Sequence, residues 1–92
     1  MVQMLFQYQI KEHFHVQYKE IMNDMIQTMQ SYGASLALWD EHEKNKFIEV
    51  YSVPTEAYYY ALKKKRQSSE IFLQCLEDPE QQIECLAIKR NR

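Results

Sequence analysis

Alternation of apolar and polar residues opens the chain and predicts a strand over Met1–Ile10. Successive side chains of a strand point to opposite faces, so every second residue shares a face. One face carries the residues Val2, Met4, Phe6, Tyr8 and Ile10. Leu5 lies among glutamines on the other face. We therefore expect the first set to pack against helices and Leu5 to lie on the opposite side of a sheet.

The period changes to three and four after Glu12, which predicts an amphipathic helix that ends at Tyr32. The apolar stripe of this helix contains Phe14, Tyr18, Ile21, Met22, Met25, Ile26, Met29 and Tyr32. Gly33 is the only glycine of the chain and follows directly. A glycine in this place suits the left-handed C-cap of a helix.

Two further runs predict a hairpin. Ala34–Trp39 is an apolar segment, and Lys46–Ser52 alternates with Phe47, Glu49 and Tyr51 on one side. The polar run 40–45 between them is typical of a turn.

The second half of the chain predicts two helices and a last strand. Pro54 excludes a central strand, and Thr55 is a suitable N-cap for a helix that ends at Arg66. A short helix is expected over 71–76, with Ser68 or Ser69 as its cap, and a turn follows at 78–81. Gln82–Lys89 is expected to close the chain as a strand.

The resulting order is β-α-β-β-α-(α)-β within one domain, residues 1–92. Because parallel crossovers are right-handed, the simplest topology is a ferredoxin-like α+β sandwich. It has a four-stranded antiparallel sheet with helices on one face. The uncovered face would need a partner, so we expect a homodimer.

Composition and charge limit the classes of partner that we expect this protein to bind. The formal net charge of −2 gives no electrostatic reason to expect nucleic acid binding. The longest uncharged apolar stretch, Ala34–Trp39, is far shorter than the roughly 20 residues that span a bilayer. The start of the chain has neither a basic leader nor a cleavage site, so we expect a cytoplasmic protein without a membrane segment.

The pattern resembles the dimeric α/β-barrel superfamily, and within it the antibiotic-biosynthesis-monooxygenase-like domains. The resemblance covers nearly the whole chain. It is carried by the strand that enters a helix at Tyr8-Gln9-Ile10-Lys11, by the hairpin after Tyr32-Gly33-Ala34, and by Phe47-Ile48-Glu49-Val50-Tyr51 followed by Thr55-Glu56-Ala57.

This resemblance implies a homodimer in which two sheets form a barrel, with a pocket between helices and sheet for a small apolar or aromatic molecule. Catalytic members often carry a histidine where this chain has Ala61, and haem-degrading members have an asparagine that the first strand lacks. No catalytic residue is therefore assigned, and no cofactor is expected. The candidate ligand-binding residues are Tyr8, Trp39, Tyr51 and Tyr58.

Three other groups have plain structural interpretations. His13 and His15 diverge at the start of a helix, so no metal site is expected. The run Lys63–Arg66 carries cations that interact favourably with the helix dipole. In the triplet Tyr58–Tyr60, Tyr58 and Ala61 are expected to pack inward unless the rings form an interface or a pocket rim.

The two cysteines, Cys75 and Cys85, are expected to be buried, reduced thiols without a neighbouring cation, Cys75 beside Ile71 and Phe72. Two classes of function remain open: a small-molecule-binding protein with monooxygenase-like chemistry, and a non-catalytic dimeric interaction or regulatory module. A cavity between the first helix and the sheet would favour the first class if tyrosine and tryptophan polar groups line it.

Overall fold

The computed structural model describes the backbone of residues 2–78 and 84–89 and the side chains of residues 2–78. The elements follow one another as β1 (Val2–Gln9), η1 (Glu12–Phe14), α1 (His15–Ser31), β2 (Ser35–Glu43), β3 (Lys46–Val53), α2 (Glu56–Gln67), α3 (Glu70–Gln74) and β4 (Glu84–Lys89).

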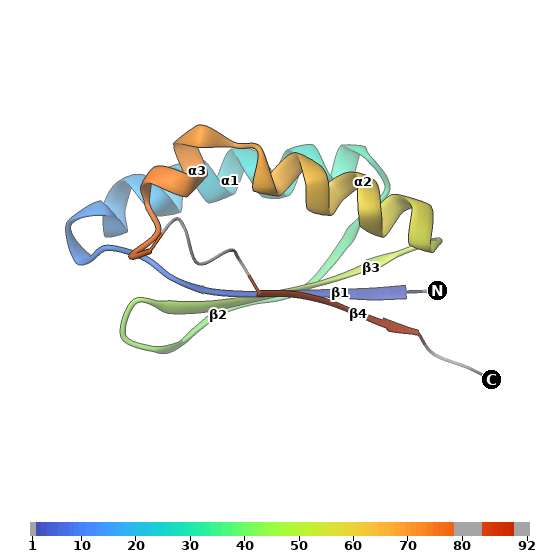
Figure 1. Ribbon diagram of the computed structural model, residues 1–92, viewed down its shortest axis with the longest axis horizontal. Coiled ribbons are helices and arrows are strands. Elements are labelled where there is room, and N and C mark those ends of the chain that lie inside the picture. Colours follow the sequence, from blue (N-terminus) through green and yellow to red (C-terminus); the bar gives the residue numbers. More distant parts are fainter. Residues whose placement is uncertain (1, 79–83, 90–92) are drawn as a thin grey trace.

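The strands form one antiparallel sheet with the order β2-β3-β1-β4. In Figure 1 all the helices lie on one face of this sheet, and no helix of the described chain covers the other face. The side chains of β1, β2 and β3 are described, whereas β4 is placed by its backbone pairing with β1. The predicted α+β, ferredoxin-like class is confirmed.

The predicted faces of the first strand are correct. Val2, Met4 and Phe6 are buried beneath the helices, and Leu5 is only half-buried on the opposite face. Leu5 pairs with Val50 of β3 and with Leu86 of β4. The open sheet face therefore has an apolar centre.

The predicted turn at 40–45 is wrong, because β2 continues to Glu43 and only Lys44 and Asn45 form the turn. The sequence of this part of β2 is polar because the strand is exposed at the edge of the sheet. Asn45 adopts a left-handed φ of 63°, which asparagine tolerates. Its backbone N–H donates to the Glu41 carboxylate at 2.8 Å, which holds the turn closed.

An irregularity in β2 lets residues three apart face the same way. The register with β3 shifts between Leu36 and Leu38. Leu36 and Trp39 consequently both pack against the core, while Leu38 is 45% exposed. Such a bulge reverses the alternation that a regular strand would have.

The predicted helix after Glu12 begins as the short turn η1, and α1 itself starts at His15. Its C-terminus is as predicted. Gly33 has a φ of +97°, and a Cβ added there would lie 3.1 Å from the ring of Tyr58.

We expect Gly33→Ala to lower the free energy of unfolding by about 1–2 kcal/mol, since an L-residue is strained at this φ. Chemical denaturation followed by circular dichroism measures the change. In a Tyr58→Ala background the ring contact disappears and the penalty becomes smaller, but the backbone strain persists. An alanine variant as stable as the parent would contradict the assigned cap.

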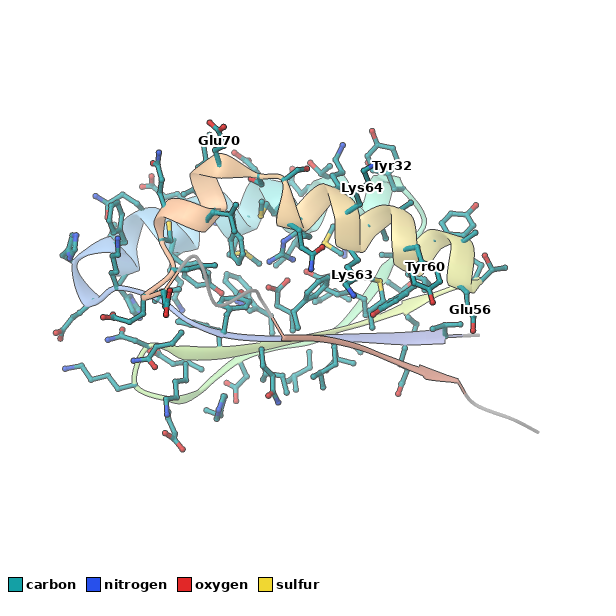
Figure 2. All side chains as sticks on the ribbon, in the orientation of Figure 1. Tyr32, Glu56, Tyr60, Lys63, Lys64 and Glu70 are labelled. Carbon is teal, nitrogen blue, oxygen red and sulfur yellow. The ribbon has the colours of Figure 1, made fainter. Side chains whose placement is uncertain are left out.

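The prediction that Tyr58 and Ala61 pack inward is wrong by one residue along the helix. Tyr59 and Leu62 are buried, whereas Tyr58 and Tyr60 are 43% and 62% exposed and Ala61 is exposed. One residue rotates a helix by about 100°, so this shift moves a different stripe inward. Figure 2 shows the neighbouring Lys64 on the outer side of the helix layer, away from the sheet.

Cys75 is a buried free thiol next to Phe72, as predicted, but Ile71 is 63% exposed. Burial raises the pKa of this thiol, although Lys11, a cation that the sequence did not reveal, partly opposes the shift. The side chain of Cys85, the turn at 79–81 and the first residues of the predicted last strand lie outside the described residues. Among the described helices, none has the length and apolar character needed to cross a membrane.

Candidate functional site

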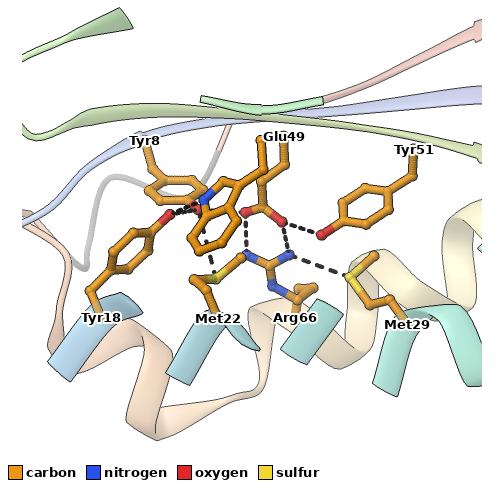
Figure 3. A network of polar contacts seen from close by, with 8 residues as sticks. Tyr8, Tyr18, Met22, Met29, Glu49, Tyr51 and Arg66 are labelled. Carbon is orange, nitrogen blue, oxygen red and sulfur yellow. Dashed lines mark hydrogen bonds and ion pairs between the residues drawn. The ribbon is translucent and has the colours of Figure 1, made fainter. Parts of the chain in front are cut away.

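A buried ion pair joins the sheet to the helix layer. Glu49 projects from β3 and Arg66 from the last turn of α2, and both side chains are almost fully buried. The two terminal guanidinium nitrogens of Arg66 donate to the two carboxylate oxygens of Glu49, each at 2.7 Å (Figure 3). This bidentate geometry is the strongest form of the arginine–carboxylate contact.

Phenol groups complete the surroundings of the carboxylate. Tyr8 and Tyr51 each donate a hydrogen bond to Glu49 at 2.5 Å. Since Tyr8 gives its only proton to the carboxylate, Tyr18 must be the donor in the 2.5 Å contact between the Tyr8 and Tyr18 hydroxyls. Trp39 in turn donates to the Tyr18 oxygen at 3.0 Å. A chain of donors therefore runs from β2 through α1 to Glu49.

Aromatic rings and thioethers surround the guanidinium. Its central carbon lies 4.7 Å from the ring centre of Phe6 and 4.5 Å from that of Phe72. The sulfur of Met29 is 3.4 Å from one terminal nitrogen of Arg66. Side chains from β1, α1 and α3 therefore enclose the guanidinium.

Electrostatics fixes the protonation states of the cluster. Burial lowers the pKa of Arg66, but the charge of Glu49 and the hydrogen bonds to it more than offset this, so the pKa is raised. Burial and the negative charge of Glu49 raise the pKa of Tyr8 and of Tyr51, and burial is the main cause for Tyr18. Neutral phenols therefore surround the ion pair. The hydroxyl protons of Tyr8, Tyr18 and Tyr51 all take part in internal hydrogen bonds.

These raised pKa values predict alkaline sensitivity. The neutral phenols favour the folded state fully below the unfolded pKa of about 10, and this contribution is lost as pH rises toward the higher folded values. We expect the free energy of unfolding to fall above about pH 10 by ~1.4 kcal/mol per buried tyrosine per pH unit. Urea denaturation at several pH values measures the slope.

Tyr51→Phe should make that alkaline slope shallower, because one titrating phenol is removed. Tyr60→Phe, which alters an exposed ring, is the matched control. Equal slopes in both variants would show that the buried phenols do not cause the alkaline loss.

The structure brings together three of the four predicted ligand-binding residues. Tyr8, Trp39 and Tyr51 belong to the Glu49 cluster, whereas Tyr58 lies apart on α2. Tyr58 instead lines an outer hollow with Tyr32 and Lys65. A ligand contact of any of the four remains a prediction.

Glu49, Arg66 and Tyr18 were missed as site residues. Glu49 alternates with Phe47 and Tyr51 on the buried face of β3, and a carboxylate in an apolar phase signals a buried partner. Arg66 lies four residues after Leu62 on the buried stripe of α2. The interpretation of Arg66 as a cation that only complements the helix dipole is therefore wrong.

A pocket of about 260 Å³ lies between α1 on one side and α2 and α3 on the other, not between α1 and the sheet. Its lining residues are Ile21, Asp24, Met25, Thr28, Met29, Leu62, Lys65, Arg66, Ser69 and Ile71. Arg66 is one of its lining residues, although its side chain is almost fully buried. Pockets of this kind, largely apolar with a few polar groups, are typical of small-molecule sites.

The histidines do not gather into a metal site. His15 lies 3.3 Å from the Glu41 carboxylate, and the ring of His13 packs on Phe14. Within residues 2–78 and 84–89, no group of three or more metal-ligating side chains is found.

Comparison with solved structures finds similar folds, among them the following three. A protein of Agrobacterium tumefaciens, Atu4242, superposes with a TM-score of 0.68 at 14% identity over 100% of this chain and 95% of its own. An antibiotic biosynthesis monooxygenase matches with a TM-score of 0.68 at 11% identity over the whole of both chains. An uncharacterized NIPSNAP domain protein from Burkholderia xenovorans matches with a TM-score of 0.63 at 13% identity, over 99% of this chain and 95% of its own.

This chain has the antibiotic-biosynthesis-monooxygenase-like fold. The resemblance drawn from the sequence is confirmed at the level of the fold, since identities of this size carry no further assignment. No protein-family model matches the sequence, and no curated protein matches it. The comparisons thus show the fold alone, and any function has to be inferred from the side chains of the site.

Proposed function

We propose that this chain is a homodimeric, small-molecule-binding protein of the dimeric α/β-barrel type, and that its ligand occupies the pocket between α1, α2 and α3. The observation that carries the proposal is this pocket, with its apolar wall and a buried arginine, in an antibiotic-biosynthesis-monooxygenase-like fold. Its volume of about 260 Å³ suits a molecule smaller than a drug.

The hydrogen bonds of the tyrosines favour the pocket between α1, α2 and α3 over the predicted pocket between the helices and the sheet. The hydroxyls of Tyr8, Tyr18 and Tyr51 all donate within the Glu49 cluster. A ligand placed there would have to break a hydrogen-bonded buried ion pair. The outer pocket can accept a ligand without that cost.

Met25→Trp should abolish binding in the pocket, because the half-buried Met25 lines it and an indole would fill it. The probe is cyclohexyl methyl ketone, added to ¹⁵N-labelled protein and followed by amide chemical shifts. We expect saturable shifts around the pocket in the parent and none in the variant.

Val16→Trp is the matched control, since Val16 is 70% exposed on the same helix and does not line the pocket. This variant should keep the parent's shifts. Persistent binding by Met25→Trp would refute the proposed site.

Monooxygenase-like chemistry on the bound molecule belongs to the same hypothesis. It predicts that O2 oxidises a methylene group of the ligand during aerobic incubation with the protein: one oxygen atom becomes a carbonyl oxygen of the ligand, and the other leaves as water with the two hydrogens of that carbon. Mass spectrometry of the recovered ligand tests this, with Met25→Trp as the control for reaction outside the pocket.

The second candidate function is a non-catalytic dimeric interaction or regulatory module. The specific observation in its favour is the open sheet face, where the half-buried residues Leu5, Ile48 and Val50 and the exposed Leu38 form an apolar patch. We call these four residues the open-face patch. Sedimentation at micromolar concentration should give a dimer under both candidates, and only the first also predicts saturable ligand binding.

A further inference from the structure

One hydrogen-bond donor of Arg66, a residue that lines the pocket, has no partner among the described residues. Arg66 is 2% exposed, and its Nε is a buried polar atom without a hydrogen bond. The carboxylate of Glu49 accepts hydrogen bonds from the two terminal nitrogens, and the Nε–H takes no part in this contact (Figure 3). Leaving a buried donor unpaired carries a desolvation cost, so such an atom calls for an explanation.

The charges around the pocket select the acceptor. The positive charge of Arg66 is already matched by the carboxylate of Glu49. Asp24 on the pocket wall repels a second anion. The ammonium of Lys65 lies 4.6 Å from the ring centre of Tyr32, so it is directed toward that ring. What the site lacks is one neutral oxygen acceptor.

The dimensions set the size of the molecule. A pocket of about 260 Å³ lies just below the range of about 300–1,000 Å³ that is typical of drug-sized ligands, so it suits a molecule of about one ring. The lining residues Ile21, Met25 and Ile71 suit a hydrocarbon body. A compound with one ring and one carbonyl group meets both conditions.

We propose that the pocket binds a small, neutral carbonyl compound with an apolar body, whose oxygen accepts a hydrogen bond from Arg66 Nε–H. This inference rests on the proposed function and specifies the class of its ligand. The pairing satisfies the buried donor that has no partner within the described part of the chain, and it adds no charge to a site that is already balanced.

Three probes of nearly equal size test the class. Cyclohexyl methyl ketone has the acceptor, isopropenylcyclohexane replaces the oxygen with a methylene group, and cyclohexanecarboxylate adds a negative charge. Titration of ¹⁵N-labelled protein gives the dissociation constants. A hydrogen bond from a charged donor predicts that the ketone binds about tenfold or more tightly than the alkene. The carboxylate should bind more weakly than the ketone.

The Arg66 Nε–H resonance reports the contact itself, and no arginine variant that risks unfolding is needed. The ketone should shift this resonance downfield and slow its exchange with solvent, whereas the alkene should not. Met25→Trp should remove the shift, and Val16→Trp should keep it.

The outcomes separate the two proposals. Equal affinities for ketone and alkene, with saturable shifts, would overturn the carbonyl class and leave the binding pocket in place. Tightest binding of the carboxylate would also overturn the class. If a bound water contacts Nε–H both before and after ketone addition, the donor is satisfied by solvent and the inference falls. Binding of none of the three probes would refute the proposed function together with it.

Discussion

Arg66→Met should lower the free energy of unfolding by about 3–5 kcal/mol at neutral pH, which is the usual cost of breaking a buried ion pair by removing one partner. The cause is the Glu49 carboxylate, which is fully buried and would lose two hydrogen bonds of 2.7 Å together with its counter-charge. Tyr8 and Tyr51 would still donate to it, but neutral phenols do not compensate a buried charge.

The second half of this prediction is a rescue. In Glu49→Gln/Arg66→Met the charge is gone, and the glutamine amide can still hydrogen-bond both phenols. We expect the double variant to regain at least half of the lost stability, since replacing both members of a buried pair is often nearly neutral. Equilibrium urea denaturation of the parent, Arg66→Met and the double variant measures the rescue.

Lys64→Met is the matched control, because it removes a neighbouring cation that is exposed on the same helix. Lys64→Met should change the free energy of unfolding by no more than ~0.5 kcal/mol. A loss in Arg66→Met no larger than in this control would show that the pair does not link the sheet to the helices.

Strong periodic signals in the sequence were enough for most of the fold. Phe6 and Leu5 were assigned to the correct faces because a strand alternates strictly and one of its faces is buried. Gly33 ended the helix as predicted, since it is the residue best suited to a φ of +97°. Long-range partners were not needed for either inference.

The errors occurred where tertiary contacts override local pattern. Glu41 and Glu43 look like turn residues, yet they belong to an edge strand whose backbone pairs with β3 while its side chains meet solvent. The three consecutive tyrosines of α2 allow more than one choice of which side chains face the core. The pairing of Arg66 with Glu49, which lies on another element, selects the phase that buries Tyr59.

The candidate site was half predictable for the same reason. Tyr8 and Tyr51 stood out as tyrosines on buried strand faces. Glu49 and Arg66 each looked like an ordinary charged residue, because only the fold shows that they meet. The pocket could not be foreseen at all, since it depends on how far α1 lies from α2 and α3.

Val50→Lys should convert the proposed dimer into a monomer. Val50 lies at the centre of the open-face patch, where it pairs with Leu5 of β1 and Leu38 of β2. A two-fold interface through this face would bring the lysines of both copies into one apolar contact. An uncompensated buried charge costs about 3–5 kcal/mol, so the dimer dissociation constant should rise at least about a hundredfold.

Sedimentation equilibrium of parent and variant across a concentration series measures that change. Val16→Lys places the same charge on an exposed position of α1 and should leave the dimer intact. Circular dichroism should show both variants folded, because Val50 is only half-buried within one chain. A parent protein with the mass of one chain at every concentration would eliminate the dimer. A dimer that tolerates Val50→Lys would move the interface away from the open sheet face.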